Sequence, residues 1–175
     1  MKNILAIPGS LRAGSSNHSI LEYFGDLMPP EISYTIYDGL RNIPAFDPAL
    51  DDETPPTGVA DLRAQLNGAH AIIICTPEYA HGVPGALKNA LDWMVSSGSF
   101  SGKPVALITA STGGEDAHEA MIKILNAIDA TLSPETMLLI PFIRTKITER
   151  NIVDPDVTLK LQHVLKHLLD ALRSL

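Results

Sequence analysis

Short apolar or alternating runs take turns along the chain with stretches in which apolar residues recur every three to four positions. The first pattern predicts strands, and the second predicts helices. Residues 4–8, 71–75, 105–109 and 137–140 are apolar at nearly every position. Residues 32–37 alternate apolar and polar side chains, which is typical of a strand with one covered face. We therefore expect five strands. The run at 71–75 is the clearest, because a strand covered on both faces is apolar throughout.

Helical spacing separates these strands. Apolar residues recur three and four positions apart over residues 20–28, 59–66, 83–94, 117–128 and 157–172. Five successive strand–helix units imply right-handed crossovers and a parallel sheet with helices on both faces. We expect one domain over residues 1–175. Residues 38–58, rich in Asp, Pro and Gly, predict a long loop of the kind that often carries function.

The turn after the first expected strand has the strongest candidate chemistry. A helix that starts directly after a strand directs several backbone N–H groups into one concavity, and its dipole favours negative charge there. Arg12 adds a planar guanidinium suited to phosphate oxygens. Neutral donors come from Ser10, Ser15, Ser16, Asn17 and Ser19. The turn is therefore interpreted as a phosphate-binding loop.

The same residues also fit a purely structural interpretation. Ser16 or Asn17 can serve as the helix N-cap, Ser19 and Glu22 fit a capping box, and Arg12 can be a solvated loop cation. The turn matches neither the P-loop, which needs Gly-Lys-Ser/Thr, nor the Gly-x-Gly-x-x-Gly dinucleotide fingerprint. Gly/Ser-rich or Pro-containing turns follow three of the strands, and such turns line the ligand crevice of open α/β sheets. Their convergence favours the phosphate-binding interpretation.

Composition narrows the class of protein. The chain of 175 residues is 45% hydrophobic and 19% charged, as is ordinary for a globular protein. Its net charge of −7 argues against a protein that binds nucleic acids in general or anionic membranes, because such proteins need a basic surface. The single Cys75 excludes an internal disulfide and fits a reducing compartment. The apolar run at 4–7 is too short for a signal peptide, so we expect a cytoplasmic protein without membrane partners.

Three motifs occur together in the chain: residues 9–12 with Ser16 and Asn17, residues 77–93, and the turn at 111–114. Together they resemble the NADPH-dependent FMN reductase family, a flavodoxin-like group that also includes quinone, azo-dye and chromate reductases. The resemblance covers residues 3 to about 140. It implies a flavodoxin-like three-layer αβα sandwich whose five-stranded parallel sheet has the order 2-1-3-4-5.

The resemblance also implies which residues bind FMN. Residues of the first loop would hold its phosphate: Ser10, Arg12, Ser16, Asn17 and Ser19. Residues of the second loop would run beside the isoalloxazine ring and ribityl chain: Pro77, Glu78, Tyr79 and Ala80. Residues of the third loop would close over the other side: Ser111, Gly113 and Gly114. Residues 43–47 resemble the family's loop near the flavin edge. No catalytic side chain and no metal are implied, because FMN carries the chemistry.

The implied activity is a two-electron transfer, by a ping-pong scheme, from NADPH or NADH through FMN to a small acceptor. A flavin, a quinone, an azo compound or a metal oxyanion would all qualify. The alternatives are a flavodoxin-type FMN electron carrier that docks protein partners, and a non-catalytic binding protein. Such carriers have an arginine-free phosphate loop and two aromatic residues around the ring, so Arg12 and the single Tyr79 count against that alternative.

Several questions stay open at the level of sequence. Relatives often carry Asn after Pro-Glu-Tyr, whereas Ala80 and His81 follow it here, so the preferred acceptor is undetermined. The choice between NADPH and NADH is also undetermined, as is whether FMN is a tightly bound group or a substrate. His163 and His167 lie four apart, but without a third ligand in view they are expected on a solvated helical face.

Cys75 and Trp93 complete the list of candidates. Cys75 invites comparison with a Cys-x5-Arg phosphatase loop, but position 81 is His, so a buried strand cysteine is expected. Trp93 and Val95 lie beside the apolar stripe of the helix over 83–94. An exposed Trp suits an interface between subunits. Members of the family that the chain resembles commonly form dimers or tetramers, so we expect a homodimer or homotetramer.

Overall fold

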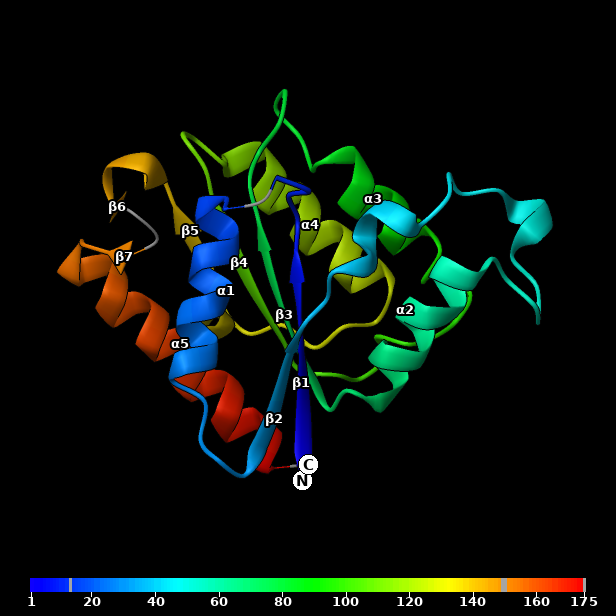
Figure 1. Cartoon of the computed structure of the whole chain (residues 1–175), viewed down its shortest axis with the longest axis horizontal. Helices are drawn as coiled ribbons and strands as arrows, with labels where there is room; N and C mark the ends of the chain where they lie inside the picture. Colours follow the sequence, from blue (N-terminus) through cyan, green and yellow to red (C-terminus); the bar gives the residue numbers. More distant parts are fainter. Residues whose placement is uncertain (13, 149–150, 175) are drawn as a thin grey trace.

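Five parallel strands form the centre of the computed structural model, which describes residues 1–12, 14–148 and 151–174 (Figure 1). They are β1 (Lys2–Pro8), β2 (Ile32–Ile36), β3 (Ala71–Thr76), β4 (Val105–Ala110) and β5 (Met137–Ile140). Their order in the sheet is β2-β1-β3-β4-β5, and every pair is parallel. The predicted strands and the predicted order are confirmed.

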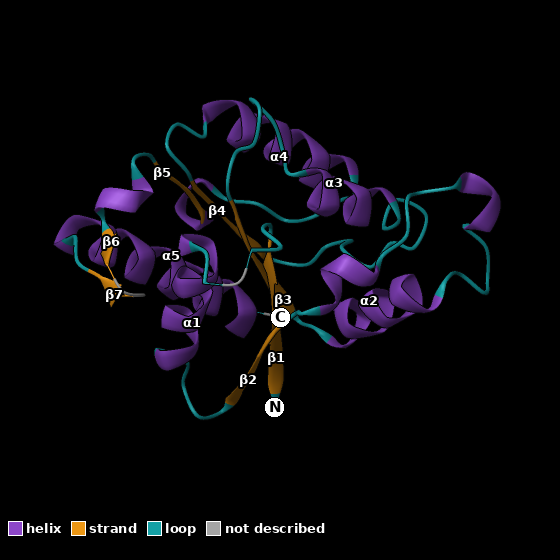
Figure 2. Ribbon diagram, turned by 45° about the horizontal axis from the view of Figure 1, so that its top comes forward, coloured by secondary structure: helices purple, strands orange, loops and turns teal. Residues whose placement is uncertain are grey.

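Helices cover both faces of this sheet, as Figures 1 and 2 show. One face carries α1 (Ser16–Asp26) and α5 (Pro155–Arg173), and the other carries α2 (Thr57–Gly68), α3 (Gly85–Asp92) and α4 (Glu115–Ala127). Successive strand residues point to opposite faces, so each buried strand contributes to two cores. Ile73 packs with α1 and α5, for example, while its neighbours Ile72 and Ile74 pack on the other side.

The strand order determines where the loops begin. The chain leaves β1 toward β2 on one side of the sheet and then returns to β3 on the other side, so β1 and β3 form the topological switch point. Pro8 pairs with Cys75, and Thr76 pairs with Thr109. The loops that follow β1, β3 and β4 therefore start beside one another at the carboxyl edge of the sheet.

The remaining segments are short. The expected long loop at 38–58 contains two 3₁₀ turns, η1 (Gly39–Asn42) and η2 (Pro48–Leu50). Two further turns, η3 (Pro134–Thr136) and η4 (Ile143–Thr145), flank β5. An antiparallel pair that the sequence analysis did not predict follows, β6 (Ile147–Thr148) with β7 (Asn151–Ile152). Among the described residues, no helix combines the length and apolar character needed to cross a membrane.

Trp93 is not at the surface, so the expectation of an exposed subunit anchor at this position was wrong. Its side chain is 0% exposed, and its indole N–H donates to the carbonyl of Pro44 at 2.9 Å. The ring of Phe46 meets it edge-on, with centroids 5.0 Å apart. Residues 43–46 fold over α3 and cover the indole, a long-range contact that helical spacing does not reveal. Val95 is exposed, as expected.

Candidate functional site

The first loop enters α1 through Ser15, which is the N-cap. Its side chain accepts a hydrogen bond from the backbone N–H of His18 at 3.2 Å, so neither Ser16 nor Asn17 fills that position. Ser16 and Asn17 are instead the first two helical residues. Backbone N–H groups in a first helical turn have no backbone partner within the helix, and an anion at this end can bind those that the cap does not use.

The side chain of Asn17 ties the start of α1 to the sheet. Its amide N–H donates to the carbonyl of Ala110 at 3.2 Å, and its oxygen accepts from the thiol of Cys75 at 3.3 Å. Cys75 is buried as predicted, and burial raises the pKa of its thiol. Asn17 therefore fixes the start of α1 against β3 and β4 through its amide.

Hydrogen bonds also join the three loops to one another. The hydroxyls of Ser10 and Tyr79 lie 3.1 Å apart, and the backbone N–H of Arg12 donates to the Ser10 hydroxyl at 3.2 Å. The backbone N–H of Glu78 donates to the hydroxyl of Ser111 at 3.2 Å. The loops after β1, β3 and β4 thus form one continuous surface.

A cavity of about 240 Å³ lies among these loops. The first loop contributes four of the residues that the family resemblance assigns to FMN: Ser10, Arg12, Ser16 and Asn17. The second and third loops contribute four more: Pro77, Glu78, Tyr79 and Ser111. Five lining residues were not among the predicted cofactor-binding residues: Ser15, Ala110, Thr112, Ile143 and Arg144. The structure therefore brings most of the predicted residues together in one place.

The other four predicted residues lie outside the lining of this cavity. Ser19 lies one turn further along α1, where its hydroxyl donates to the carbonyl of Ser15 at 3.4 Å. It borders a separate hollow beside β7. Gly114 is the N-cap of α4 with φ 119°, and a Cβ there would lie 2.8 Å from Leu139 Cδ1. Gly113 precedes it, and Ala80 lies in an exposed turn.

That exposed turn connects Tyr79 to Gly82. The two residues exchange backbone hydrogen bonds of 3.0 and 3.1 Å around Ala80 and His81, whose φ angles are 48° and 58°. Turns with two left-handed residues favour Asn and Gly, so Ala and His are unusual here. A hydrogen bond of 2.8 Å between His81 Nδ1 and Asp116 Oδ2 holds the turn against α4.

Glu78 reinforces the same attachment, because its carboxylate accepts a hydrogen bond from the backbone N–H of Ala117 at 3.0 Å. Glu78, His81 and Asp116 are also the described residues whose potential metal-ligand atoms lie within 4.8 Å of one another. Two hydrogen bonds between the second loop and α4 account for this grouping. One joins Glu78 to Ala117, and the other joins His81 to Asp116.

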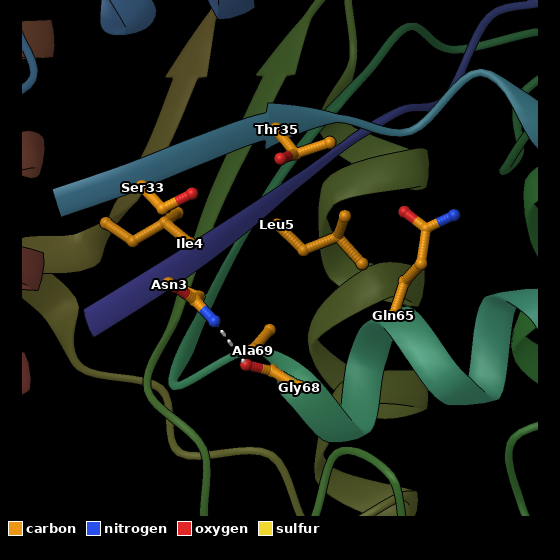
Figure 3. A pocket seen from close by; sticks show the side chains of 8 residues that line it. All are labelled: Asn3, Ile4, Leu5, Ser33, Thr35, Gln65, Gly68 and Ala69. Carbon is orange, nitrogen blue, oxygen red and sulfur yellow. Dashed lines mark hydrogen bonds between the residues drawn. The ribbon is translucent and has the colours of Figure 1, made fainter. Parts of the chain in front are cut away.

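A second hollow, of about 230 Å³, lies beside the first half of β1 (Figure 3). Ser33 and Thr35 of β2 border it on one side, and Gln65 of α2 borders it on the other. The amide of Asn3 donates to the carbonyl of Gly68 at 3.1 Å. None of the lining side chains ionises, and the hollow is away from the loops that follow the strands. The cavity at the carboxyl edge is therefore the candidate functional site.

A model of the NADPH-dependent FMN reductase family matches residues 2–144 of the chain. The chain belongs to this family. Among curated proteins, it is 38% identical over 112 residues to an NAD(P)H-dependent FMN reductase of Pseudomonas aeruginosa, covering 63% of this chain and 60% of the relative. It is 32% identical over 142 residues to a quinone reductase of Escherichia coli, covering 77% and 76%.

A third relative is the NADH:(hydroxy)cinnamate reductase subunit CrdA of Vibrio ruber. It is 34% identical over 134 residues, which cover 76% of this chain and 64% of the relative. The matched stretch thus spans less than two thirds of the Pseudomonas and Vibrio proteins. The flavoenzyme NAD(P)H:(acceptor) oxidoreductase FerB of Paracoccus denitrificans shares the fold, with a TM-score of 0.85 at 23% identity over 99% of this chain and 98% of FerB.

Proposed function

We propose that this protein is an FMN-dependent NAD(P)H oxidoreductase that transfers two electrons to a small acceptor. The observation that carries the proposal is the cavity in which the α1 N-terminus and Arg12 meet the second and third loops. When bound, FMN supplies the hydride and electron chemistry. Family membership supports this assignment.

The donor set of the cavity fits the phosphate of FMN. The hydroxyls of Ser10 and Ser16, the guanidinium of Arg12 and the first N–H groups of α1 are all on or beside its lining. Tyr79 is 53% exposed while its hydroxyl contacts Ser10, so its ring offers a flat apolar face at the mouth. These residues would bind and orient the cofactor while leaving its outer face open.

The acceptor would be a small planar molecule or an oxyanion. The relatives named above are an FMN reductase, a quinone reductase and a cinnamate reductase subunit, which supports free flavins, quinones and similar conjugated acceptors. Selectivity would depend on the 38–58 loop and on the Ala80–His81 turn. We also propose a cytoplasmic homodimer or homotetramer. With Trp93 buried, the exposed Val95 remains as a surface contact for this assembly.

An absorption spectrum of the purified protein incubated with FMN, followed by anaerobic titration with NADPH and with NADH, tests the proposal. We expect flavin bands that bleach when the nicotinamide is added. A protein that takes up FMN but is not reduced by either nicotinamide would be an electron carrier instead. A protein that takes up no FMN would contradict the proposed function altogether.

We expect ping-pong kinetics. Donor and acceptor would both approach FMN from the open side of the cavity that the three loops line, so they would bind in turn. Initial rates at several fixed acceptor concentrations should give parallel double-reciprocal lines. Intersecting lines, which indicate a ternary complex, would show that the two substrates do not share the cavity.

Replacing Arg12 with alanine should weaken FMN binding by about 1.5–3 kcal/mol, the range for a hydrogen bond to a charged group. This corresponds to about a 10- to 150-fold rise in Kd. Riboflavin lacks the phosphate, so its affinity should hardly change. Quenching of flavin fluorescence measures both constants. Arg173→Ala, at the end of α5, is the matched control, and an unchanged Kd for FMN in the Arg12 variant would place the phosphate elsewhere.

A further inference from the structure

Arg144 lines the same cavity as Arg12, although the two residues lie far apart in the sequence. It belongs to η4, which follows β5 and leads into β6 on the α1 side of the molecule in both overall views (Figures 1 and 2). The backbone N–H of Ile143 donates to the carbonyl of Ser111 at 3.0 Å. That bond fixes η4 against the third loop, which forms one wall of the cavity.

The backbone before Arg144 turns sharply. Phe142 has φ 54°, a left-handed conformation that is uncommon for a bulky residue, and its N–H donates to the carbonyl of Thr112 at 3.1 Å. Such a conformation persists only where the surrounding contacts enforce it, and it often occurs next to functional sites. Here it redirects the chain from the end of β5 so that Ile143 and Arg144 border the cavity.

The charged residues that line the cavity are Arg12, Arg144 and Glu78. Among the described residues, no ion pair includes Arg12 or Arg144. Glu78 is the acidic residue of the lining, but one of its carboxylate oxygens accepts from the Ala117 N–H and the other lies toward Gly113. Two cations on one cavity repel each other unless an anion lies between them. In a chain of net charge −7, this local excess of positive charge points to an anionic ligand.

We propose that Arg144 is a second phosphate-binding residue and that it holds the phosphate of FMN together with Arg12. This inference rests on the proposed function. A phosphate monoester carries about −1.5 to −2 charge near pH 7 and has three terminal oxygens. One guanidinium engages at most two of those oxygens through its paired N–H groups. A second guanidinium, from the loop after β5, supplies donors for the remaining oxygen and favours the dianion over neutral riboflavin.

The test compares Arg144→Ala, Arg144→Lys, Arg12→Ala and the double alanine variant for binding of FMN and of riboflavin by fluorescence quenching. We expect Arg144→Ala to raise the Kd for FMN about tenfold and to leave the Kd for riboflavin unchanged. Arg144→Lys should restore part of the affinity, because lysine keeps the charge without the fork. The losses of FMN affinity in Arg144→Ala and in Arg12→Ala should both be smaller at high salt. Circular dichroism confirms that each variant folds, and Arg173→Ala again controls for the loss of one surface cation.

Two outcomes would overturn the inference while leaving the proposed function intact. In the first, Arg144→Ala keeps the wild-type affinity for FMN, and Arg144 is a solvated side chain. In the second, FMN affinity is again unchanged but the KM for NADPH or NADH rises, and Arg144 contacts the dinucleotide. A wild-type protein that binds FMN no more tightly than riboflavin would instead overturn the phosphate site itself.

Discussion

Replacing Trp93 with alanine should lower the free energy of unfolding by about 3–5 kcal/mol, the range for removing a large buried aromatic side chain. The indole is fully buried, and its N–H donates to the carbonyl of Pro44. Its removal would leave a cavity and would remove one of the two hydrogen bonds that hold the Pro44 carbonyl, leaving only the bond from the Asn89 amide. Urea denaturation followed by circular dichroism gives the number, because the variant lacks the only tryptophan of the chain.

The matched control is Val95→Ala, two positions further along. Val95 is 64% exposed, so its truncation should change the free energy of unfolding by less than about 0.5 kcal/mol. If Trp93→Ala cost no more than the Val95 variant, the packing of residues 43–46 over α3 would not exist in solution. The two variants thus compare the loss of a buried side chain, Trp93, with the loss of an exposed one, Val95.

Gly9→Ala should destabilise the protein by about 3 kcal/mol, at the upper end of what overpacking costs. A Cβ on Gly9 would lie 2.3 Å from the Oγ1 of Thr76 and 2.8 Å from its Cα, so the backbones of two neighbouring strands would have to separate. The N–H of Gly9 also donates to the carbonyl of Cys75 at 2.8 Å. Since the first two loops of the candidate site begin here, FMN affinity should fall along with stability.

Gly85→Ala provides the comparison for this prediction. A Cβ on Gly85, the first residue of α3, meets no atom within 4 Å. Alanine is a better helix former than glycine, so this variant should be neutral or more stable by up to about 1 kcal/mol. Equal melting temperatures for the two variants would mean that Gly9 does not pack against Thr76 as described.

Much of the fold was predictable from the sequence, because its strongest signals are local. The apolar run at 71–75 can be stable only when covered on both faces, and β3 is buried at every position. The strand order followed from the family resemblance rather than from the periodicity. The β6–β7 pair was missed because strands of two residues are too short to show any period.

The candidate site was predictable where its residues follow a distinctive turn, and much less so elsewhere. The first loop is recognisable from its Gly/Ser-rich composition, whereas Arg144 follows a strand end that has no such composition. Its proximity to Arg12 is a product of the sheet order and of the strained turn at Phe142. Local spacing also does not distinguish Ser15 from Ser16 as the N-cap. Nor does it show that the amide of Asn17 faces Cys75 and Ala110.

Because Cys75 contacts Asn17 in the folded protein, the reactivity of its thiol reports the separation of α1 from β3. Thiol reagents attack the thiolate, and this thiol is both fully buried and held protonated by its raised pKa. A brief pulse of a maleimide at neutral pH should therefore label only molecules in which α1 has separated from β3. Because the chain has a single cysteine, each opened molecule gains one label and one fixed increment of mass. Intact-protein mass spectrometry would then count the opened population directly, without any added probe site.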